Sequence, residues 1–179
     1  PRFVTALKAK DLSKFFKKKQ KLVGLFVNAD LNLIEHISEY VGLDYIQLHG
    51  EETSDYIEKI KKKIKKPIIK AIPVSSPEDI NYSKKIESIC DMILFDTKQN
   101  KTNLSGGSGI SFNWGLLENY SPKKDWILAG GLNIKNIKKA LRKTNAPIID
   151  VSSGVEKKLG VKCQNKIKKF INYLKKDDC

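Results

Sequence analysis

The sequence predicts an α/β fold of the TIM (β/α)8 type, in which about six of the eight strands are present. Short, nearly continuous apolar runs alternate with amphipathic stretches along the 179 residues, and such alternation is typical of a parallel sheet covered on both faces. Polar and glycine-rich residues directly follow most of the runs. In a barrel these residues line the C-terminal rim, whereas an open sheet concentrates ligand residues at one switch point.

Six segments are expected to be strands, because each is too short for a helix and almost wholly apolar. They cover residues 22–27, 45–49, 67–72, 92–96, 126–129 and 147–151. One helix, at about residues 9–19, is expected before the first strand and carries Leu12, Phe15 and Phe16.

Amphipathic helices are expected between the strands. Apolar residues recur every three to four positions after Asp30, after Thr53, after Asn133 and around Phe170. Asp30, Thr53 and Asn133 are residue types that cap the first free N–H groups of a helix. The segment Ser76-Pro77-Glu78-Asp79 combines a cap, a first-turn proline and acids near the positive helix end.

A single domain is expected over residues 1–179, since this length suits one core. A closed barrel needs eight strands and at least about 200 residues. We therefore expect the domain to be N-terminally incomplete by about two strands and one helix. The alternatives are an open barrel or one completed by another chain.

The net charge of +14 comes from 34 Lys+Arg against 20 Asp+Glu. Only Arg2 and Arg142 are arginines, the residue type that nucleic-acid-binding proteins favour for bidentate contacts. The lysine runs at residues 17–19, 61–63 and 65–66 contain no interleaved aromatic residues to stack on bases. We interpret the charge as a solvated lysine-rich surface and expect no nucleic-acid partner.

Neither a membrane nor a metal partner is expected. The apolar runs are far shorter than the ~20 residues of a membrane span, and the first residues lack a signal pattern. Cys90, Cys163 and Cys179 are widely scattered and form no C-x-x-C pair. This usage argues against a disulfide framework or a zinc site and fits a cytoplasmic protein.

Two loops rich in glycine and serine follow the last two expected strands, at Gly130-Gly131 and Ser152-Ser153-Gly154. Glycine lets a backbone approach a ligand closely, and a helix beginning at Asn133 would point free N–H groups to the same place. Loops in these positions are the recurring phosphate site of TIM barrels. Gly130, Gly131, Ser153 and Gly154 are therefore candidate phosphate-binding residues; the alternative is two tight turns that need small residues.

Motifs along almost the whole chain resemble the phosphoribosylanthranilate isomerase family of tryptophan biosynthesis. They are Pro1–Val4, Val23–Asn28, Ile46–Glu52, Ile69–Ile72, Leu94–Lys98, Gly106–Gly109 with Phe112–Trp114, Ile127–Asn133 and Asp150–Glu156. The resemblance implies an eight-stranded barrel that works without metal or cofactor. Its reaction is the Amadori rearrangement of N-(5-phosphoribosyl)anthranilate to 1-(2-carboxyphenylamino)-1-deoxyribulose 5-phosphate.

The resemblance also implies roles for single residues. Asp96 matches the general acid that protonates the ring oxygen of the ribose; the alternative is a cap on the following turn. Arg2 matches the residue that binds the anthranilate carboxylate, a bidentate task for which arginine suits better than lysine; the alternative is a frayed terminus. His49 and Asp150 match substrate-binding residues of the rim, and a structural role for His49 is equally open.

One feature of the family has no counterpart in the sequence. The resemblance implies a general-base cysteine in a Lys-Ile-Cys-Gly strand, and we expect that strand upstream of Pro1. Cys90 precedes its expected strand and therefore belongs to the opposite face. Because a positioned base contributes roughly 10²–10⁴ in rate, we expect these 179 residues alone to be nearly inactive.

The expected partner is a small phosphorylated aminosugar, and a monomer and a homodimer are both compatible with the sequence. Two alternative functions stay open. One is another phosphate-binding barrel isomerase or epimerase. The other is a catalytically dead fragment that acts as a binding module.

Overall fold

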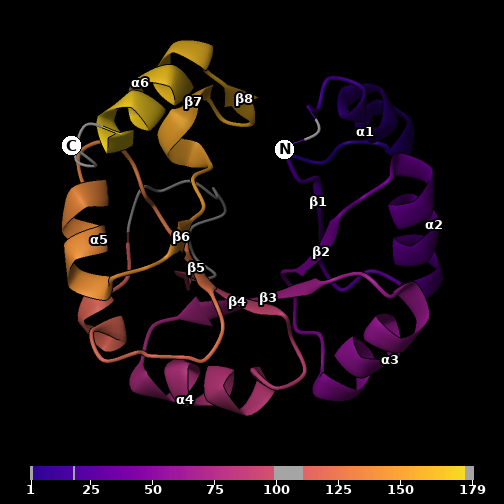
Figure 1. The fold of residues 1–179 in the computed structure, drawn as a ribbon, viewed down its shortest axis with the longest axis horizontal. Coiled ribbons are helices and arrows are strands. Elements are labelled where there is room, and N and C mark those ends of the chain that lie inside the picture. Colours follow the sequence, from indigo (N-terminus) through magenta and orange to yellow (C-terminus); the bar gives the residue numbers. More distant parts are fainter. Residues whose placement is uncertain (1, 18, 99–110, 176–179) are drawn as a thin grey trace. The chain divides into compact units, whose positions relative to one another are not determined.

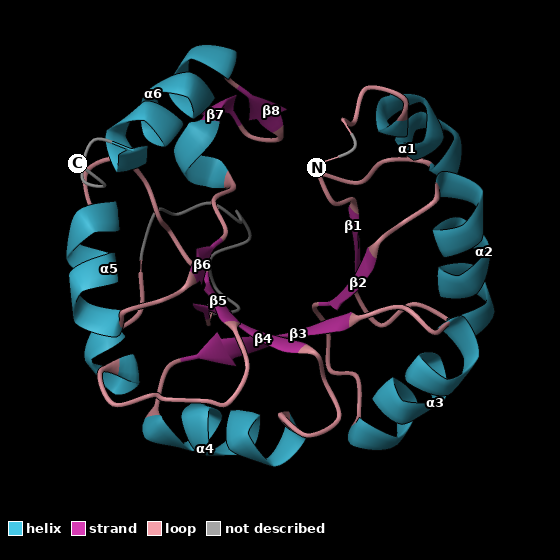
Figure 2. Cartoon of the chain, in the orientation of Figure 1, coloured by secondary structure: helices cyan, strands magenta, loops and turns pink. Residues whose placement is uncertain are grey.

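The computed structural model describes residues 2–17, 19–98 and 111–175 (Figures 1 and 2). Six strands hydrogen-bond in sequence order into one sheet, and three of the pairings, β1 with β2, β2 with β3 and β5 with β6, are recorded as parallel. The strands are β1 Val23–Phe26, β2 Tyr45–Leu48, β3 Ile68–Val74, β4 Met92–Thr97, β5 Trp126–Leu128 and β6 Ile148–Ile149. Each lies inside or largely inside an expected segment, which confirms the α/β architecture.

Helices lie between the strands. They are α1 Ala6–Ser13, α2 Leu31–Val41, α3 Ser54–Ile64, α4 Pro77–Ile86, α5 Ile137–Thr144 and α6 Gln164–Lys175, with 3-10 turns η1 Trp114–Leu117 and η2 Ser153–Val155. The Asp30 carboxylate accepts the Asn32 N–H at 2.8 Å, and the Thr53 hydroxyl accepts the Tyr56 N–H at 3.3 Å. Both predicted caps are therefore confirmed.

Two helix boundaries and one hairpin differ from the expectation. The first helix begins at Ala6, because the Thr5 hydroxyl accepts the Lys8 N–H and caps it there, so Phe15 and Phe16 lie beyond its end. Helix α5 begins at Ile137, after a turn that starts at Asn133. An antiparallel hairpin, β7 Glu156–Lys158 and β8 Val161–Lys162, follows β6 and was not expected.

The chain forms two compact units. The first unit comprises residues 3–72 and 83–93, and the second comprises residues 1–2, 73–82 and 94–179. Two of the boundaries fall inside strands β3 and β4, and a third falls inside helix α4. A single domain over residues 1–179 stays a prediction.

Each unit has its own buried apolar residues. In the first unit Ile34, Ile46 and Ile57 are fully buried. In the second unit the rings of Phe95, Tyr120 and Trp126 pack edge to face, with centroids 4.9–5.6 Å apart. Aromatic pairs of this geometry add to the stabilisation that their burial provides.

Strand β1 stands at one end of the sheet order and carries exposed apolar side chains. Val23 and Leu25 are 42% and 56% exposed, and Val27, directly after the strand, is 59% exposed. An edge strand with an apolar face is a template for pairing with another chain. The exposed apolar side chains of β1 therefore offer a surface on which a further strand can pack.

A buried ion pair joins three segments of the first unit. The Lys70 Nζ on β3 lies 2.8 Å from Glu52 Oε2, and their side chains are 3% and 1% exposed. Lys70 also donates to the Gly50 carbonyl, while Glu52 accepts the N–H groups of Asn28 and Gly50 at 2.9 and 3.0 Å. The loops that follow β1 and β2 are thereby fixed to β3.

The pKa of Glu52 lies below its ordinary value. Burial alone raises that pKa, but the hydrogen bonds from Lys70 and from the Asn28 N–H stabilise the carboxylate more strongly. Glu52 therefore stays ionised while buried. Gly50 completes the arrangement, since a side chain there would collide with the backbone and amide of Asn28.

We expect Lys70→Met to destabilise the chain by about 3–5 kcal/mol at pH 7, because it leaves a buried carboxylate without its cation. Urea unfolding measures this loss. Lys63→Met is the matched control: its 2.7 Å pair with Glu35 is partly exposed, so it should cost no more than about 1 kcal/mol. Equal small losses in both variants would contradict the prediction.

The same pair predicts a pH dependence. A carboxylate whose folded-state pKa is lowered stabilises the fold above its unfolded pKa and loses that contribution as the pH falls. The difference between wild type and Lys70→Met should therefore shrink as the pH falls from 7 to 3, because protonation of Glu52 removes the unpaired charge from the variant and the ion pair from the wild type. Urea unfolding between pH 7 and pH 3 measures it, and a difference that does not change over this range would contradict the prediction.

Candidate active site

Asp96 lies near the carboxyl end of β4, directly against the loop that follows β5. Its side chain is half-buried, and its Oδ1 accepts the Thr97 N–H at 2.7 Å. Gly130 has a φ of +87°, and a Cβ there would lie 2.7 Å from the Thr97 nitrogen and 3.2 Å from Asp96 Oδ1. Only glycine fits this approach. The hydrogen bond from the Thr97 N–H is also the contact expected if Asp96 only caps the turn after β4.

The two glycine- and serine-rich loops pack on each other. Gly154 lies in η2, and a Cβ on it would meet the Leu132 carbonyl oxygen and lie 3.0 Å from the Asn133 Cα. The structure therefore brings together Gly130, Gly131, Ser153 and Gly154, the four residues with a predicted phosphate role. An anion can be bound where the backbone N–H groups of such loops converge.

Two asparagines fix the orientation of the Gly131 peptide. The Nδ2 groups of Asn133 and Asn136 both donate to the Gly131 carbonyl at 3.0 Å. The Asn136 Oδ1 accepts the Asn133 N–H at 2.8 Å, and the Asn133 Oδ1 accepts the Lys135 N–H at 2.9 Å. Because a trans peptide holds C=O and N–H in opposite directions, this bracing sets the direction of the Leu132 N–H.

Asp150 and His49 both follow strands directly. Asp150 is exposed after β6, and its N–H donates to the Leu128 carbonyl at 2.8 Å. His49 follows β2 in the first unit, where Gln47 Nε2 donates to its Nδ1 at 3.0 Å. This contact places the proton of the neutral ring on Nε2.

Arg2 forms a bidentate ion pair within the second unit. Its Nε and Nη2 donate to the two carboxylate oxygens of Glu156 at 2.9 and 3.0 Å, and the side chains of Arg2 and Glu156 are 35% and 5% exposed. Glu156 also accepts from Lys162 Nζ at 3.0 Å and from the Gly160 N–H at 3.2 Å. In this structure Arg2 is held by the ion pair and is not a frayed terminal residue.

The Arg2 hydrogen bond is the main reason why the pKa of Glu156 falls to about 2, and it outweighs the opposing effect of burial. Glu156 is not among the site residues that the sequence predicts. Its only signal was its place at the end of the segment 150–156. The sequence could not indicate its pairing with Arg2, because 154 positions separate the two residues.

The two described cysteines do not directly follow any of the six strands β1 to β6. Cys90 is buried two residues before β4 begins. Cys163 immediately precedes α6, and hydrogen bonds from backbone N–H groups of that helix, chiefly of Lys166, lower the pKa of its thiol. Cys179 and the segment Gly106–Gly109 lie outside the described residues. Within those residues, no three His, Cys, Asp or Glu side chains form a metal-binding group.

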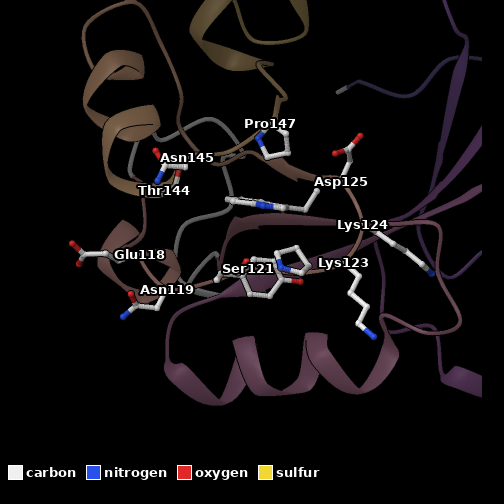
Figure 3. A pocket seen from close by; sticks show the side chains of 12 residues that line it. Glu118, Asn119, Ser121, Lys123, Lys124, Asp125, Thr144, Asn145 and Pro147 are labelled. Carbon is white, nitrogen blue, oxygen red and sulfur yellow. The ribbon is translucent and has the colours of Figure 1, made fainter.

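A cavity of about 570 Å³ lies at the other end of β5 and β6 (Figure 3). Its lining includes Glu118, Lys123, Asn145 and Pro147, from segments that precede these two strands, and Trp126, the first residue of β5. Gly130 and Ser153 follow the same strands. The cavity is therefore separate from the candidate site. Across the described ranges, no helix combines the length and apolar character that crossing a membrane requires.

Comparison with known proteins places the chain in one family. The family model for N-(5'-phosphoribosyl)anthranilate (PRA) isomerase matches residues 1–173. The isomerase of Paracoccus denitrificans is 41% identical over 172 residues, which are 96% of this chain and 80% of the relative. That of Rhodospirillum centenum is 39% identical over 90% of this chain and 77% of the relative.

Comparison with solved structures points to the same family. The phosphoribosylanthranilate isomerase of Thermotoga maritima matches with a TM-score of 0.86 and 34% identity, over 97% of this chain and 82% of that chain. An isomerase in complex with reduced 1-(o-carboxyphenylamino)-1-deoxyribulose 5-phosphate matches with a TM-score of 0.82 and 31% identity, over 97% and 81%. These matches and the six strands in sequence order confirm the TIM-type fold with about six strands. The chain belongs to the phosphoribosylanthranilate isomerase family, enzymes of tryptophan biosynthesis.

Proposed function

We propose that this chain binds N-(5-phosphoribosyl)anthranilate and serves its Amadori rearrangement with Asp96 as the general acid. One observation carries the proposal: the Gly130 backbone lies against the Asp96 carboxylate, and the turn of Ser153 and Gly154 packs on the same loop. An acid and a candidate phosphate cradle therefore adjoin each other. A ribosyl phosphate bound there would present its ring to the acid.

The acid step has a simple balance. Protonated Asp96 gives its proton to the ring oxygen of the ribose while the bond from C1 to that oxygen breaks. The nitrogen lone pair forms the C=N bond of the Schiff base, and Asp96 becomes a carboxylate. Removal of the proton on C2 then gives the enamine, which tautomerises to the ketone product. The family's cysteine base would take that proton, and we assign this step to no described residue.

Binding is assigned to both ends of the substrate. Gly130, Gly131, Ser153 and Gly154 would hold the phosphate, and Arg2 the anthranilate carboxylate. His49 and Asp150 stay substrate-binding proposals, and no metal or cofactor enters the proposed steps. The related isomerase that was solved with a reduced product analogue supports a phosphorylated small molecule as ligand.

Assembly and location are also proposals. A Thermotoga maritima relative is described as a dimeric isomerase from which monomers were made, so both a monomer and a homodimer of this chain stay predictions. A cytoplasmic location is expected from the biosynthetic role. The alternative of a nucleic-acid-binding module is supported only by the net charge of +14, and it requires binding that falls steeply with salt.

Asp96→Asn should abolish turnover and spare binding. We expect a loss of at least about 10²-fold in kcat, since general acid catalysis contributes that much or more. The affinity for the reduced analogue should change by less than about threefold, because the amide keeps the shape of the side chain. Turnover is measured on the protein as its gene encodes it, with any residues that precede Pro1, and affinity by calorimetry.

The matched control is Asp125→Asn, an exposed aspartate immediately before β5. It should leave both turnover and affinity unchanged. Near-wild-type turnover of Asp96→Asn would remove Asp96 from the role of acid.

Gly154→Ala should weaken binding of the reduced analogue by about tenfold or more, which corresponds to one hydrogen bond to a charged group. The added methyl group would press on the Leu132 carbonyl and separate the two loops. Calorimetry measures the affinity. Gly42→Ala is the control, because Gly42 has a φ of +81° and open space around it. That change should lower stability only; unchanged affinity in Gly154→Ala would argue against the phosphate cradle.

A further inference from the structure

The β7–β8 hairpin contacts groups at both ends of the proposed substrate site. Glu156 opens the hairpin and holds Arg2, the residue proposed for the substrate carboxylate. Lys162 closes the hairpin and donates to the carbonyl and hydroxyl oxygens of Ser152 at 2.9 and 2.8 Å. Ser152 immediately precedes the turn η2, which carries the proposed phosphate donors.

We propose that this hairpin is a positioning element. Glu156 orients Arg2, and Lys162 connects Glu156 to Ser152, next to the turn η2 with the proposed phosphate donors (the phosphate turn). The inference rests on the proposed function and names residues to which that function gives no role. Neither Glu156 nor Lys162 needs to touch the substrate. Both act by fixing groups that do.

The geometry of the guanidinium group supports the role of Glu156. Its fork uses Nε and Nη2 on the two oxygens of Glu156. A guanidinium group has five N–H donors, so the edge formed by Nη1 and Nη2 still offers two parallel N–H groups. That edge suits a second carboxylate in bidentate geometry. Arg2 can therefore hold Glu156 and a substrate carboxylate together.

Lys162 supplies charge as well as contact. Arg2 and Glu156 alone would be neutral and would attract an anion weakly. Lys162 Nζ lies 3.0 Å from Glu156 Oε1, which gives the three side chains a net charge of one positive unit. Its three N–H groups match three acceptors, one on Glu156 and two on Ser152.

The chain fixes Glu156 firmly from other directions. Its Oε2 accepts the Gly160 N–H at the turn of the hairpin, where Gly160 has a φ of +77°. Its carbonyl accepts from Lys166 of α6 at 2.6 Å. With a pKa of about 2, the carboxylate stays charged at every pH at which the enzyme would work. Arg2 is therefore held by a rigid and permanently ionised partner.

The test compares two probes by calorimetry on the full chain. One is the reduced analogue, and the other is the same compound without its carboxylate, reduced 1-phenylamino-1-deoxyribulose 5-phosphate. Glu156→Gln should weaken the first by roughly 10- to 100-fold, the usual range of coupling between contacting residues. It should change the affinity for the second by less than about threefold. Glu118→Gln, which breaks the exposed 2.7 Å pair with Lys143, is the control and should change neither.

A double-mutant cycle separates positioning from general destabilisation. In an Arg2→Met background, Glu156→Gln should cost less than about twofold in affinity for the reduced analogue, because the group that it orients is gone. A merely structural Glu156 would cost the same in both backgrounds, and that result overturns the proposal.

Lys162→Met keeps the Arg2 pair and is the second variant. It should weaken both probes by about twofold to fivefold, the size expected for a partly exposed ion pair. If Lys162→Met changes the affinity for neither probe, the proposed link between Lys162 and the phosphate turn is overturned. This variant can still be measured if Glu156→Gln fails to fold. If the wild-type chain binds neither probe, the proposed function fails with the inference. If it binds both and Glu156→Gln binds them equally well, only the inference fails.

Discussion

Close approach between backbone segments is the constraint on which the proposed site depends. Gly130 can lie against Asp96 and Thr97 only because it has no side chain, and Gly154 meets Leu132 for the same reason. These two contacts bring the loops after β5 and β6 to the end of β4. A side chain at either position would separate the proposed acid from the proposed phosphate donors.

Buried carboxylates hold the loops at strand ends in both units. Glu52 in the first unit and Glu156 in the second each accept one lysine and at least one backbone N–H group. Removing a carboxylate from water is costly, and each arrangement offsets that cost with several charged hydrogen bonds. The net gain in stability is small. What the chain obtains is a fixed position for segments that would otherwise move.

Local pattern predicted the strands and caps, because apolar runs and capping residues act over a few positions. It missed the β7–β8 hairpin, which is short and rich in lysine and so carries no apolar run. It placed the glycine loops correctly but began α5 too early, since the turn at Asn133 comes before the regular helix. The partner of Arg2 could not be predicted, because only the tertiary fold brings Glu156 to it.

Composition alone could not tell which lysines matter. Most of the positive charge is solvated, as at Lys62, whose side chain is 82% exposed. Lys70 is buried against Glu52, and Lys162 uses its three donors on named acceptors. A lysine whose side chain is held in one conformation places its charge at a fixed point. The charge of a solvated lysine is instead screened by salt within about 10 Å. The lysines with a defined role are therefore the few whose side chains the fold holds in one position.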